Sequence, residues 1–171
     1  MPSNIEIKAR VRDSVALSAR ARELSDTPEQ VIPQVDTFFI TQKGRLKLRE
    51  LDSGLAQLIY YERRDQDGPK RSDYTIFETR DPDALKLVLA QALGIRGRVE
   101  KIRRLFLIGQ TRVHLDEVKG LGCFVELEVV LQPRQSDQDG RLIAERLLRQ
   151  LGIEQQDLLE SAYMDLLEQA K

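Results

Sequence analysis

The stretch N-I-E-I-K-A-R-V-R at residues 4–12 decides how the rest of the sequence is interpreted. Its odd-numbered residues from Ile5 to Val11 are apolar and its even-numbered residues from Glu6 to Arg12 are charged. This period of two predicts a β-strand with one apolar and one charged face. Same-face neighbours on a strand lie about 7 Å apart, so side chains of both signs could serve one ligand. Taken alone, such a strand is more often half-buried with its charged face in water.

Similar patterns predict the remaining elements. Strands are expected at residues 4–12, 34–41, 45–50, 57–63, 74–79, 98–108, 110–118 and 123–131. Helical spacing of apolar residues predicts helices at 14–24, 81–93 and 141–151, and a helical region from residue 154 to residue 171. Residues 25–33, 64–73 and 133–140 are expected to be loops. About eight strands with helices between them indicate an α+β fold with antiparallel pairing, in one domain of residues 1–171.

The composition excludes several classes of protein. With 41% hydrophobic and 32% charged residues, the chain has the composition of an ordinary globular protein. A net charge of -1 creates no field that would attract nucleic acid or a membrane surface, so neither is expected as a partner. The sequence contains no signal peptide and no apolar run of about 18 residues, which predicts a cytoplasmic location. With Cys123 as the only cysteine, an internal disulfide and a cysteine-rich zinc site are excluded.

The charged positions of the predicted strands have a common bias. Apart from His114, they hold ten basic and four acidic residues in a chain with a net charge of -1: Glu6, Lys8, Arg10, Arg12, Arg45, Lys47, Arg49, Arg63, Lys101, Arg103, Arg112, Asp116, Glu126 and Glu128. The alternate positions are largely apolar and need to be covered, and the predicted helices have apolar stripes that can cover them.

Two geometries satisfy this pattern. In an open sheet with helices on one face, the charges form a solvated surface. In a closed barrel, the apolar faces point outward under the helices and the charged faces point into the lumen. Charges buried on that scale need to pair with one another or with a highly charged ligand. The spacing alone does not choose between the two geometries.

In the barrel geometry, the side chains indicate a phosphate-rich ligand and a metal. Arginine binds phosphate oxygens bidentately and lysine acts as a point charge. Glu6, Glu126 and Glu128, with Asp116 as a possible fourth group, offer the hard oxygen ligands that suit Mg²⁺ or Mn²⁺.

Several short motifs, taken in order along the chain, resemble the CYTH family, the triphosphate tunnel metalloenzymes. They are E-x-K at residues 6–8, L-K-L-R at 46–49, Y-x-R at 61–63, K-x-R at 101–103, Asp116 and E-L-E at 126–128. The closing S-A-Y-M-D-L-L at 161–167 resembles, with one extra residue, the C-terminal motif of the cyclase-like branch. The family includes class IV adenylyl cyclases, thiamine triphosphatases and inorganic triphosphatases.

The resemblance implies an eight-stranded antiparallel barrel with helices packed on its outside, which binds a triphosphate-containing small molecule in a basic tunnel. It implies Mg²⁺ or Mn²⁺ held by Glu6, Glu126 and Glu128, which are also the expected catalytic residues. It implies phosphate binding by Lys8, Lys47, Arg49, Arg63 and Arg103, with Arg45, Lys101 and Arg112 as additions. Asp116 would orient a basic residue or help to hold the metal. Tunnel enzymes of this kind are often monomers or homodimers.

Asn4 departs from the family signature E-x-E-x-K, in which the first position is a glutamate. An asparagine can offer a carbonyl oxygen to a metal but no charge, so the departure bears on the reaction more than on binding. We expect a metal-dependent enzyme that hydrolyses a triphosphate, such as tripolyphosphate, thiamine triphosphate or a nucleoside triphosphate, or a class IV adenylyl cyclase that makes cyclic AMP from ATP. The alternatives are a non-catalytic polyphosphate- or nucleotide-binding module and a protein-interaction domain with a solvated charged sheet.

Overall fold

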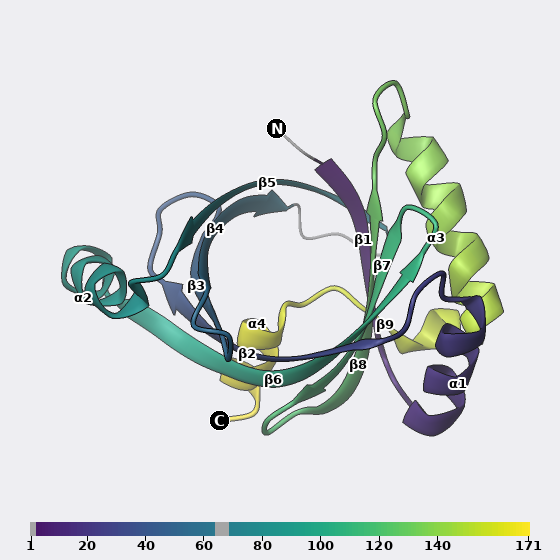
Figure 1. Ribbon diagram of the computed structural model, residues 1–171, viewed down its shortest axis with the longest axis horizontal. Helices are drawn as coiled ribbons and strands as arrows, with labels where there is room; N and C mark the ends of the chain where they lie inside the picture. The colour runs from purple at the N-terminus through teal and green to yellow at the C-terminus, as the bar shows by residue number, and fades with distance from the viewer. Residues whose placement is uncertain (1–2, 64–68) are drawn as a thin grey trace.

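Eight antiparallel strands form a closed barrel in the computed structural model, which describes residues 3–63 and 69–171 (Figure 1). The strands are β1 (Ser3–Arg10), β2 (Gln30–Phe39), β3 (Arg45–Leu51), β4 (Ala56–Arg63), β5 (Lys70–Thr79), β6 (Ile95–Ile108), β7 (Thr111–Val118) and β8 (Gly122–Val130). Their order around the barrel is β5-β4-β3-β2-β6-β7-β8-β1. The helices are α1 (Ser14–Leu24), α2 (Pro82–Leu93), α3 (Asp137–Leu151) and α4 (Tyr163–Gln169).

Strand β1 closes the barrel because it pairs with a neighbour on each side. Along one edge, Glu6 lies opposite Glu128 of β8, and along the other edge it lies opposite Lys70 of β5. Since successive side chains of a strand point to opposite faces, closure sends one face of every strand into the lumen. The predicted α+β fold with an eight-stranded antiparallel barrel is confirmed, and the open sheet is excluded.

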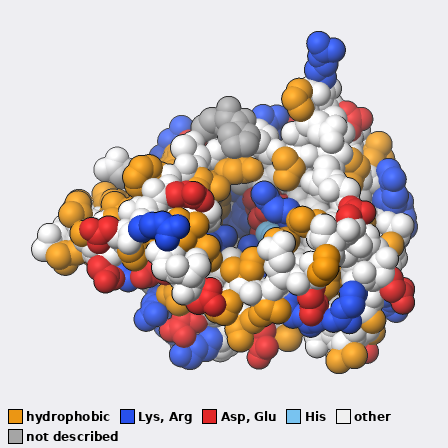
Figure 2. Space-filling model, viewed as in Figure 1, with side chains coloured by type: hydrophobic (Ala, Val, Ile, Leu, Met, Phe, Trp, Pro, Cys, Tyr) orange, Lys and Arg blue, Asp and Glu red, His pale blue; other side chains and the backbone are white. Residues whose placement is uncertain are grey.

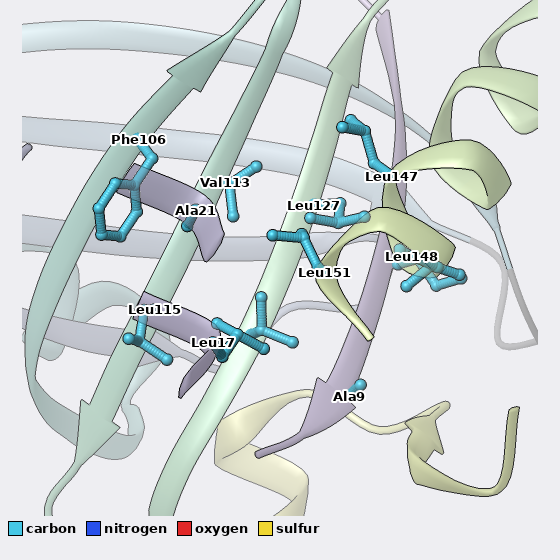
Figure 3. Close-up of a cluster of buried hydrophobic side chains, with 12 residues drawn as sticks. Ala9, Leu17, Ala21, Phe106, Val113, Leu115, Leu127, Leu147, Leu148 and Leu151 are labelled. Carbon is cyan, nitrogen blue, oxygen red and sulfur yellow. The ribbon is translucent and has the colours of Figure 1, made fainter. Parts of the chain in front are cut away.

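The outward faces are apolar and are covered by helices. Helices α1 and α3 lie side by side against β1, β6, β7 and β8 (Figure 1). Leu17 and Ala21 of α1 meet Leu147 and Leu151 of α3 in a cluster with the outward side chains of those strands (Figure 3). On the opposite side of the barrel, α2 packs on β2 and β3. The opposite faces of the strands therefore point into the lumen, whereas Arg10 is exposed and Arg12, beyond the end of β1, pairs with Asp157 at the surface.

The C-terminal segment lies across one end of the barrel. A two-residue strand, β9 (Leu158–Leu159), pairs with β1, and a short 3₁₀ helix, η1 (Gln155–Asp157), precedes it. Beyond β9, the backbone carbonyls of Glu160 and Ser161 accept hydrogen bonds from Lys70 and Lys8. Tyr163 and Met164 of α4 then pack on four inward-facing apolar side chains: Phe38, Val99, Val118 and Phe124. Together these contacts cover this end of the barrel.

Two predicted loops are partly wrong because strands occupy them. Residues 25–33 were expected to be a loop, yet β2 begins at Gln30 and contains Pro33. The proline is tolerated because it lies beyond the last pairing of β2 with β3 and has a strand neighbour on one side only, β6. The expected loop at 64–73 falls in part on residues 64–68, which are outside the described residues, and from Lys70 onward it is strand β5.

The remaining differences are at the ends of elements. Strand β1 ends at Arg10 instead of residue 12, and α3 begins at Asp137, where Ser136 and Asp139 form a capping box. The helical region expected from residue 154 onward contains α-helix only at Tyr163–Gln169. Among the described residues, no helix is both long and apolar enough to cross a membrane.

Substitution of Leu151 by alanine tests the helix layer. Leu151 is 0% exposed, and its loss would leave a cavity between α3, α1 and the outer face of the barrel. We expect Leu151→Ala to lower the free energy of unfolding by about 2–5 kcal/mol, measured by urea denaturation. Leu142→Ala is the matched control, since Leu142 lies on the same helix and is 51% exposed. Equal losses in both variants would contradict this packing.

Candidate functional site in the barrel lumen

The lumen contains a cavity of about 380 Å³ that is lined by the inward faces of the strands. Figure 2 shows basic and acidic side chains inside this hollow. Ten of the twelve predicted site residues line it: Glu6, Lys8, Lys47, Arg49, Arg63, Lys101, Arg103, Arg112, Glu126 and Glu128. They come from six strands, which the closed barrel brings together although they are far apart in the sequence.

The other two predicted site residues have different surroundings. Arg45 lies at the end covered by the C-terminal segment, where its guanidinium donates to Asp165 of α4 at 3.3 Å. Asp116 is 0% exposed and binds Arg103 with both carboxylate oxygens, at 2.8 and 2.7 Å. It also accepts a hydrogen bond from the Tyr163 hydroxyl at 2.9 Å. This geometry makes Asp116 a group that orients Arg103.

A second buried carboxylate, Asp36 of β2, organises the basic side of the lumen. It accepts hydrogen bonds from Lys47 at 3.1 Å and from Arg49 at 2.8 and 2.9 Å. Burial would raise the pKa of Asp36, but Arg49, Lys47 and Lys101 outweigh it and hold the pKa well below its usual value. Asp36 is therefore ionised, and it fixes the positions of the cations around it.

Lys8 and Lys101 lie close to one aromatic ring at the covered end. The Lys8 ammonium is 4.0 Å from the centre of the Tyr163 ring, and the Lys101 ammonium is 5.0 Å from it. Both distances suit a cation–π interaction. Burial, followed by the positive charge of Arg103, lowers the pKa of Lys101 to about 7. An anionic ligand in the lumen would favour the protonated form of this lysine.

Three carboxylates face the lumen from β1 and β8. Glu6 binds Arg63 at 3.1 Å, Glu126 lies 3.5 Å from Lys8, and Glu128 binds Arg112 at 2.9 Å. Burial and then the negative charges of Glu126 and Glu128 raise the pKa of Glu6. Glu6 is thus close enough to Glu126 and Glu128 to be repelled by both, and a cation nearby would relieve that repulsion. Burial would raise the pKa of Glu126, but Lys8 and Arg103 outweigh it and hold the pKa well below its usual value.

Metal-ligating atoms converge at one point of this acidic region. His114 of β7 lies opposite Glu126 on β8, and one ligand atom each from His114, Glu126 and Glu128 can be chosen so that all lie within 4.8 Å of one another. Burial, followed by the charge of Arg103, lowers the pKa of His114 to about 4, so its imidazole is neutral at neutral pH. Two carboxylates and a neutral imidazole fit a divalent cation.

Several buried polar atoms in the lumen have no hydrogen-bond partner among the described residues. They are Asn4 Oδ1, Gln34 Oε1, Ser72 Oγ, His114 Nδ1 and the Nε and Nη2 atoms of Arg63. The residues that carry them all line the cavity. Buried polar groups are nearly always paired in folded proteins, so this concentration in one cavity indicates groups that pair with a ligand or with water.

The end of the cavity away from α4 has a different lining. Apolar side chains at the strand ends on that side surround it: Ile32, Leu51, Ile76 and Leu105. Arg112 and Gln57 are polar exceptions, and the Arg112 side chain is 37% exposed. The cavity thus passes from an apolar mouth to a charged middle, and then to the apolar layer under α4.

Sequence reasoning missed Asp36, Gln34, Ser72 and Tyr163 as lining or organising residues. Asp36 is a lone acid in the apolar run V-D-T-F-F, and its position in phase with Gln34 could have marked it as inward-facing. Ser72 lies in the segment expected to be a loop. No local signal places Tyr163, because its contact with Asp116 joins residues 47 positions apart.

The CYTH domain family matches residues 3–163, and this chain belongs to that family. No curated protein matches the sequence significantly. Among solved structures, a Pyrococcus horikoshii OT3 protein is similar, with 23% identity, a TM-score of 0.83, and coverage of 95% of this chain and 98% of that chain. A candidate adenylate cyclase from Vibrio parahaemolyticus has 21% identity and a TM-score of 0.76, with 96% and 97% covered.

A candidate adenylyl cyclase from Hippeastrum, described as having a dominant triphosphatase activity, is also similar. It has 16% identity and a TM-score of 0.69, with 100% of this chain and 97% of that chain covered. At these identities the likeness concerns the fold alone.

Substitution of Asp36 tests the charge balance of the lumen. Asp36→Asn removes the counter-ion of Lys47, Arg49 and Lys101, so we expect it to lower the free energy of unfolding by about 3–5 kcal/mol. Tripolyphosphate should raise the melting temperature more in this variant than in the wild type, because it supplies the missing negative charge. Glu100→Gln, which weakens only solvent-exposed ion pairs with Lys119 and Arg98, is the control and should change little. An equal rise of the melting temperature in wild type and Asp36→Asn would contradict the assignment of Asp36 as the counter-ion of these three cations.

Proposed function

We propose that this CYTH protein is a divalent-metal-dependent enzyme that hydrolyses a triphosphate-bearing small molecule bound in the lumen. The observation that carries the proposal is the combination, in one cavity of the closed barrel, of a basic wall with three glutamates from β1 and β8. Seven basic and four acidic side chains line the cavity, and Asp116 lies behind Arg103. Cations therefore exceed carboxylates by two, which suits a triphosphate that carries a bound divalent metal.

The basic side chains would bind the phosphates. Arg49 and Arg103 are held by Asp36 and Asp116, so their guanidinium groups are oriented before a ligand arrives. Arg63 has two nitrogen atoms with no partner among the described residues and can donate to a phosphate oxygen. Such fixed donors stabilise charge as it develops on the transferred phosphoryl group.

Glu6, Glu126 and Glu128 would hold the metal, which when bound neutralises charge on the phosphate oxygens. Their carboxylate oxygens are hard ligands of the kind such a metal prefers, and the metal would share them with Arg63, Lys8 and Arg112. Asp116, which is engaged by Arg103 and Tyr163, is assigned to positioning Arg103 and not to the metal.

Hydrolysis is the reaction that this cavity favours. Water needs no further orientation of the substrate, whereas cyclisation requires a ribose hydroxyl to be folded back onto the α-phosphorus. The side chains at the mouth are mainly apolar and offer few polar contacts for that purpose. The triphosphatase description of the similar Hippeastrum protein agrees with this choice.

Product analysis tests the function. The protein is incubated with tripolyphosphate, thiamine triphosphate or ATP, each with Mg²⁺ or Mn²⁺, and the products are separated by ion chromatography. We expect phosphate and a diphosphate product. Cyclic AMP with pyrophosphate would instead establish the cyclase, and thermal stabilisation without any product would establish a binding module. No stabilisation by any of the compounds would leave a protein-interaction domain.

Substitution of Glu128 tests the metal assignment within this function. We expect Glu128→Gln to lower kcat at least about 100-fold with an unchanged circular dichroism spectrum, because the variant loses a charged oxygen ligand but keeps its shape. Glu117→Gln, on the outward face of β7, is the control and should keep full activity. Full activity of Glu128→Gln would contradict the assignment.

The apolar mouth gives a preference for triphosphates that carry an organic group. With phosphates in the charged middle of the cavity, an attached organic group would lie among Ile32, Ile76 and Leu105. Inorganic tripolyphosphate would leave these side chains without a partner. Each methylene buried on binding contributes about 0.8 kcal/mol, so the contact is large enough to discriminate between substrates.

Leu105→Ala measures that preference. We expect kcat/KM to fall about 10-fold for whichever of thiamine triphosphate and ATP has the higher kcat/KM in the wild type. For tripolyphosphate kcat/KM should remain unchanged, because the lost contact involves only the organic group. Ile102→Ala on the outward face of the same strand, where Ile102 is 47% exposed, is the control. A parallel fall for all substrates would show that Leu105 supports the cavity wall and not the organic group.

A further inference from the structure

We propose that His114 is a nitrogen ligand of the metal, together with Glu126 and Glu128, and that the site consequently prefers Mn²⁺ to Mg²⁺. The inference rests on the proposed function in one respect, namely that a divalent metal binds in the lumen. It goes beyond that function by assigning a ligand of a different element and by placing the metal on the β7–β8 side of the barrel.

The position of His114 is suitable for a ligand. It lies in the middle of β7, is 4% exposed and lines the cavity. Its cross-strand neighbour on β8 is Glu126, and the next inward residue of that strand is Glu128. The three side chains therefore approach one point from two adjacent strands, which hold them at a fixed separation.

The Nδ1 atom of His114 is available to a ligand. It is buried and has no hydrogen-bond partner among the described residues. Oε1 of Glu128 lies 3.8 Å away, which is too far for a hydrogen bond. A histidine with a structural role would be expected to pair this nitrogen, because an unpaired buried polar atom costs about 1–3 kcal/mol.

The carboxylates leave room for a shared metal. Arg112 binds Oε2 of Glu128, so the oxygen nearer to His114 is the other one, Oε1. Lys8 lies 3.5 Å from Oε2 of Glu126, a distance that leaves this contact weak. The arrangement thus presents oxygens of two glutamates and one imidazole nitrogen around a common position.

The β1 side of the lumen is a poorer place for the metal. It provides one carboxylate, Glu6, which Arg63 already binds at 3.1 Å. Asn4, the inward residue before Glu6 on the same strand, is neutral, although its buried Oδ1 has no partner among the described residues. Charge and ligand number therefore both favour the β7–β8 side, where His114, Glu126 and Glu128 offer ligand atoms within 4.8 Å of one another.

A nitrogen ligand has a consequence for metal choice. Mg²⁺ prefers oxygen ligands in a regular octahedron and retains several waters. Imidazole suits first-row transition metals, and mixed nitrogen and carboxylate ligands shift preference away from Mg²⁺. Among the two metals expected for this site, Mn²⁺ should bind more tightly.

Pulsed electron paramagnetic resonance on the Mn²⁺-loaded protein tests the inference directly. A coordinated imidazole gives a ¹⁴N modulation on the Mn²⁺ signal, and His114 is the only histidine of the chain, so such a signal has one possible source. The protein must be prepared without a histidine tag. We expect the modulation in the wild type and its absence in His114→Gln.

Metal affinities give a second readout that does not depend on activity. Competition between Mn²⁺ and Mg²⁺ is followed by the signal of free Mn²⁺, and we expect the preference for Mn²⁺ to fall at least about 10-fold in His114→Gln. Glu117→Gln on the outward face of the same strand is the control and should keep the wild-type preference.

The outcomes separate this inference from the proposed function. Mn²⁺ that binds to the wild type without ¹⁴N modulation overturns the role of His114 but leaves the metal-dependent function intact. Failure of the wild type to bind either Mn²⁺ or Mg²⁺ overturns both, whereas binding of Mg²⁺ without Mn²⁺ overturns only the role of His114. If His114→Gln does not fold, the presence or absence of ¹⁴N modulation in the wild-type protein alone decides whether His114 binds the metal.

Discussion

The structure depends on the antiparallel pairing between β1 and β5, which joins the first strand of the chain to one that begins about sixty residues later. Without that ladder, the eight strands would form an open sheet, and their charged faces would be hydrated like any other surface. With it, one face of every strand enters a confined space where water is scarce and charges interact strongly. Closure is therefore the constraint that turns an ordinary alternating pattern into a cavity with chemical properties.

A confined group of charges is stable only when it is nearly balanced. Asp36 and Asp116 provide much of this balance, each held by an arginine and each fully shielded from solvent. They are as important to the site as the residues that face a ligand, because they keep the guanidinium groups in place while the cavity is empty. The glutamates of β1 and β8 differ, since Glu6 is repelled by Glu126 and Glu128 although each of the three has a basic neighbour. The lumen thus combines a rigid basic part with an acidic part in which a further cation would be stabilised.

Much of this arrangement could be predicted from alternation alone. In β1, β3 and β8, apolar residues alternate cleanly with charged ones, so the inward positions such as Glu6, Lys47 and Glu128 were identifiable. In β5, the segment K-R-S-D has polar residues on both faces, because Lys70 and Ser72 are buried on the lumen side while Arg71 and Asp73 lie on the outer side with access to solvent. No apolar period marks such a strand. Pro33 similarly conceals the start of β2, since its tolerance depends on where β3 ends.

Other features of the site depend on contacts between distant parts of the chain. Arg45 belongs to the same alternating pattern as Lys47 and Arg49, but it donates a hydrogen bond to Asp165 because α4 lies next to it. The sequence makes Asp116 a candidate metal ligand. In the structure it accepts two short hydrogen bonds from Arg103, which indicates that it positions this arginine. The sequence specifies which residues enter the lumen, and the pairing among them depends on side-chain packing that no local pattern contains.

The C-terminal segment across one end of the barrel has a consequence for the order of events in a catalytic cycle. A ligand that enters through the apolar mouth with its phosphates first must leave by the way it came. The phosphate cleaved from the inner end of the chain would then be behind the larger product and would depart last. Inorganic phosphate would accordingly compete with incoming substrate for the emptied lumen, and its escape would set an upper limit on turnover.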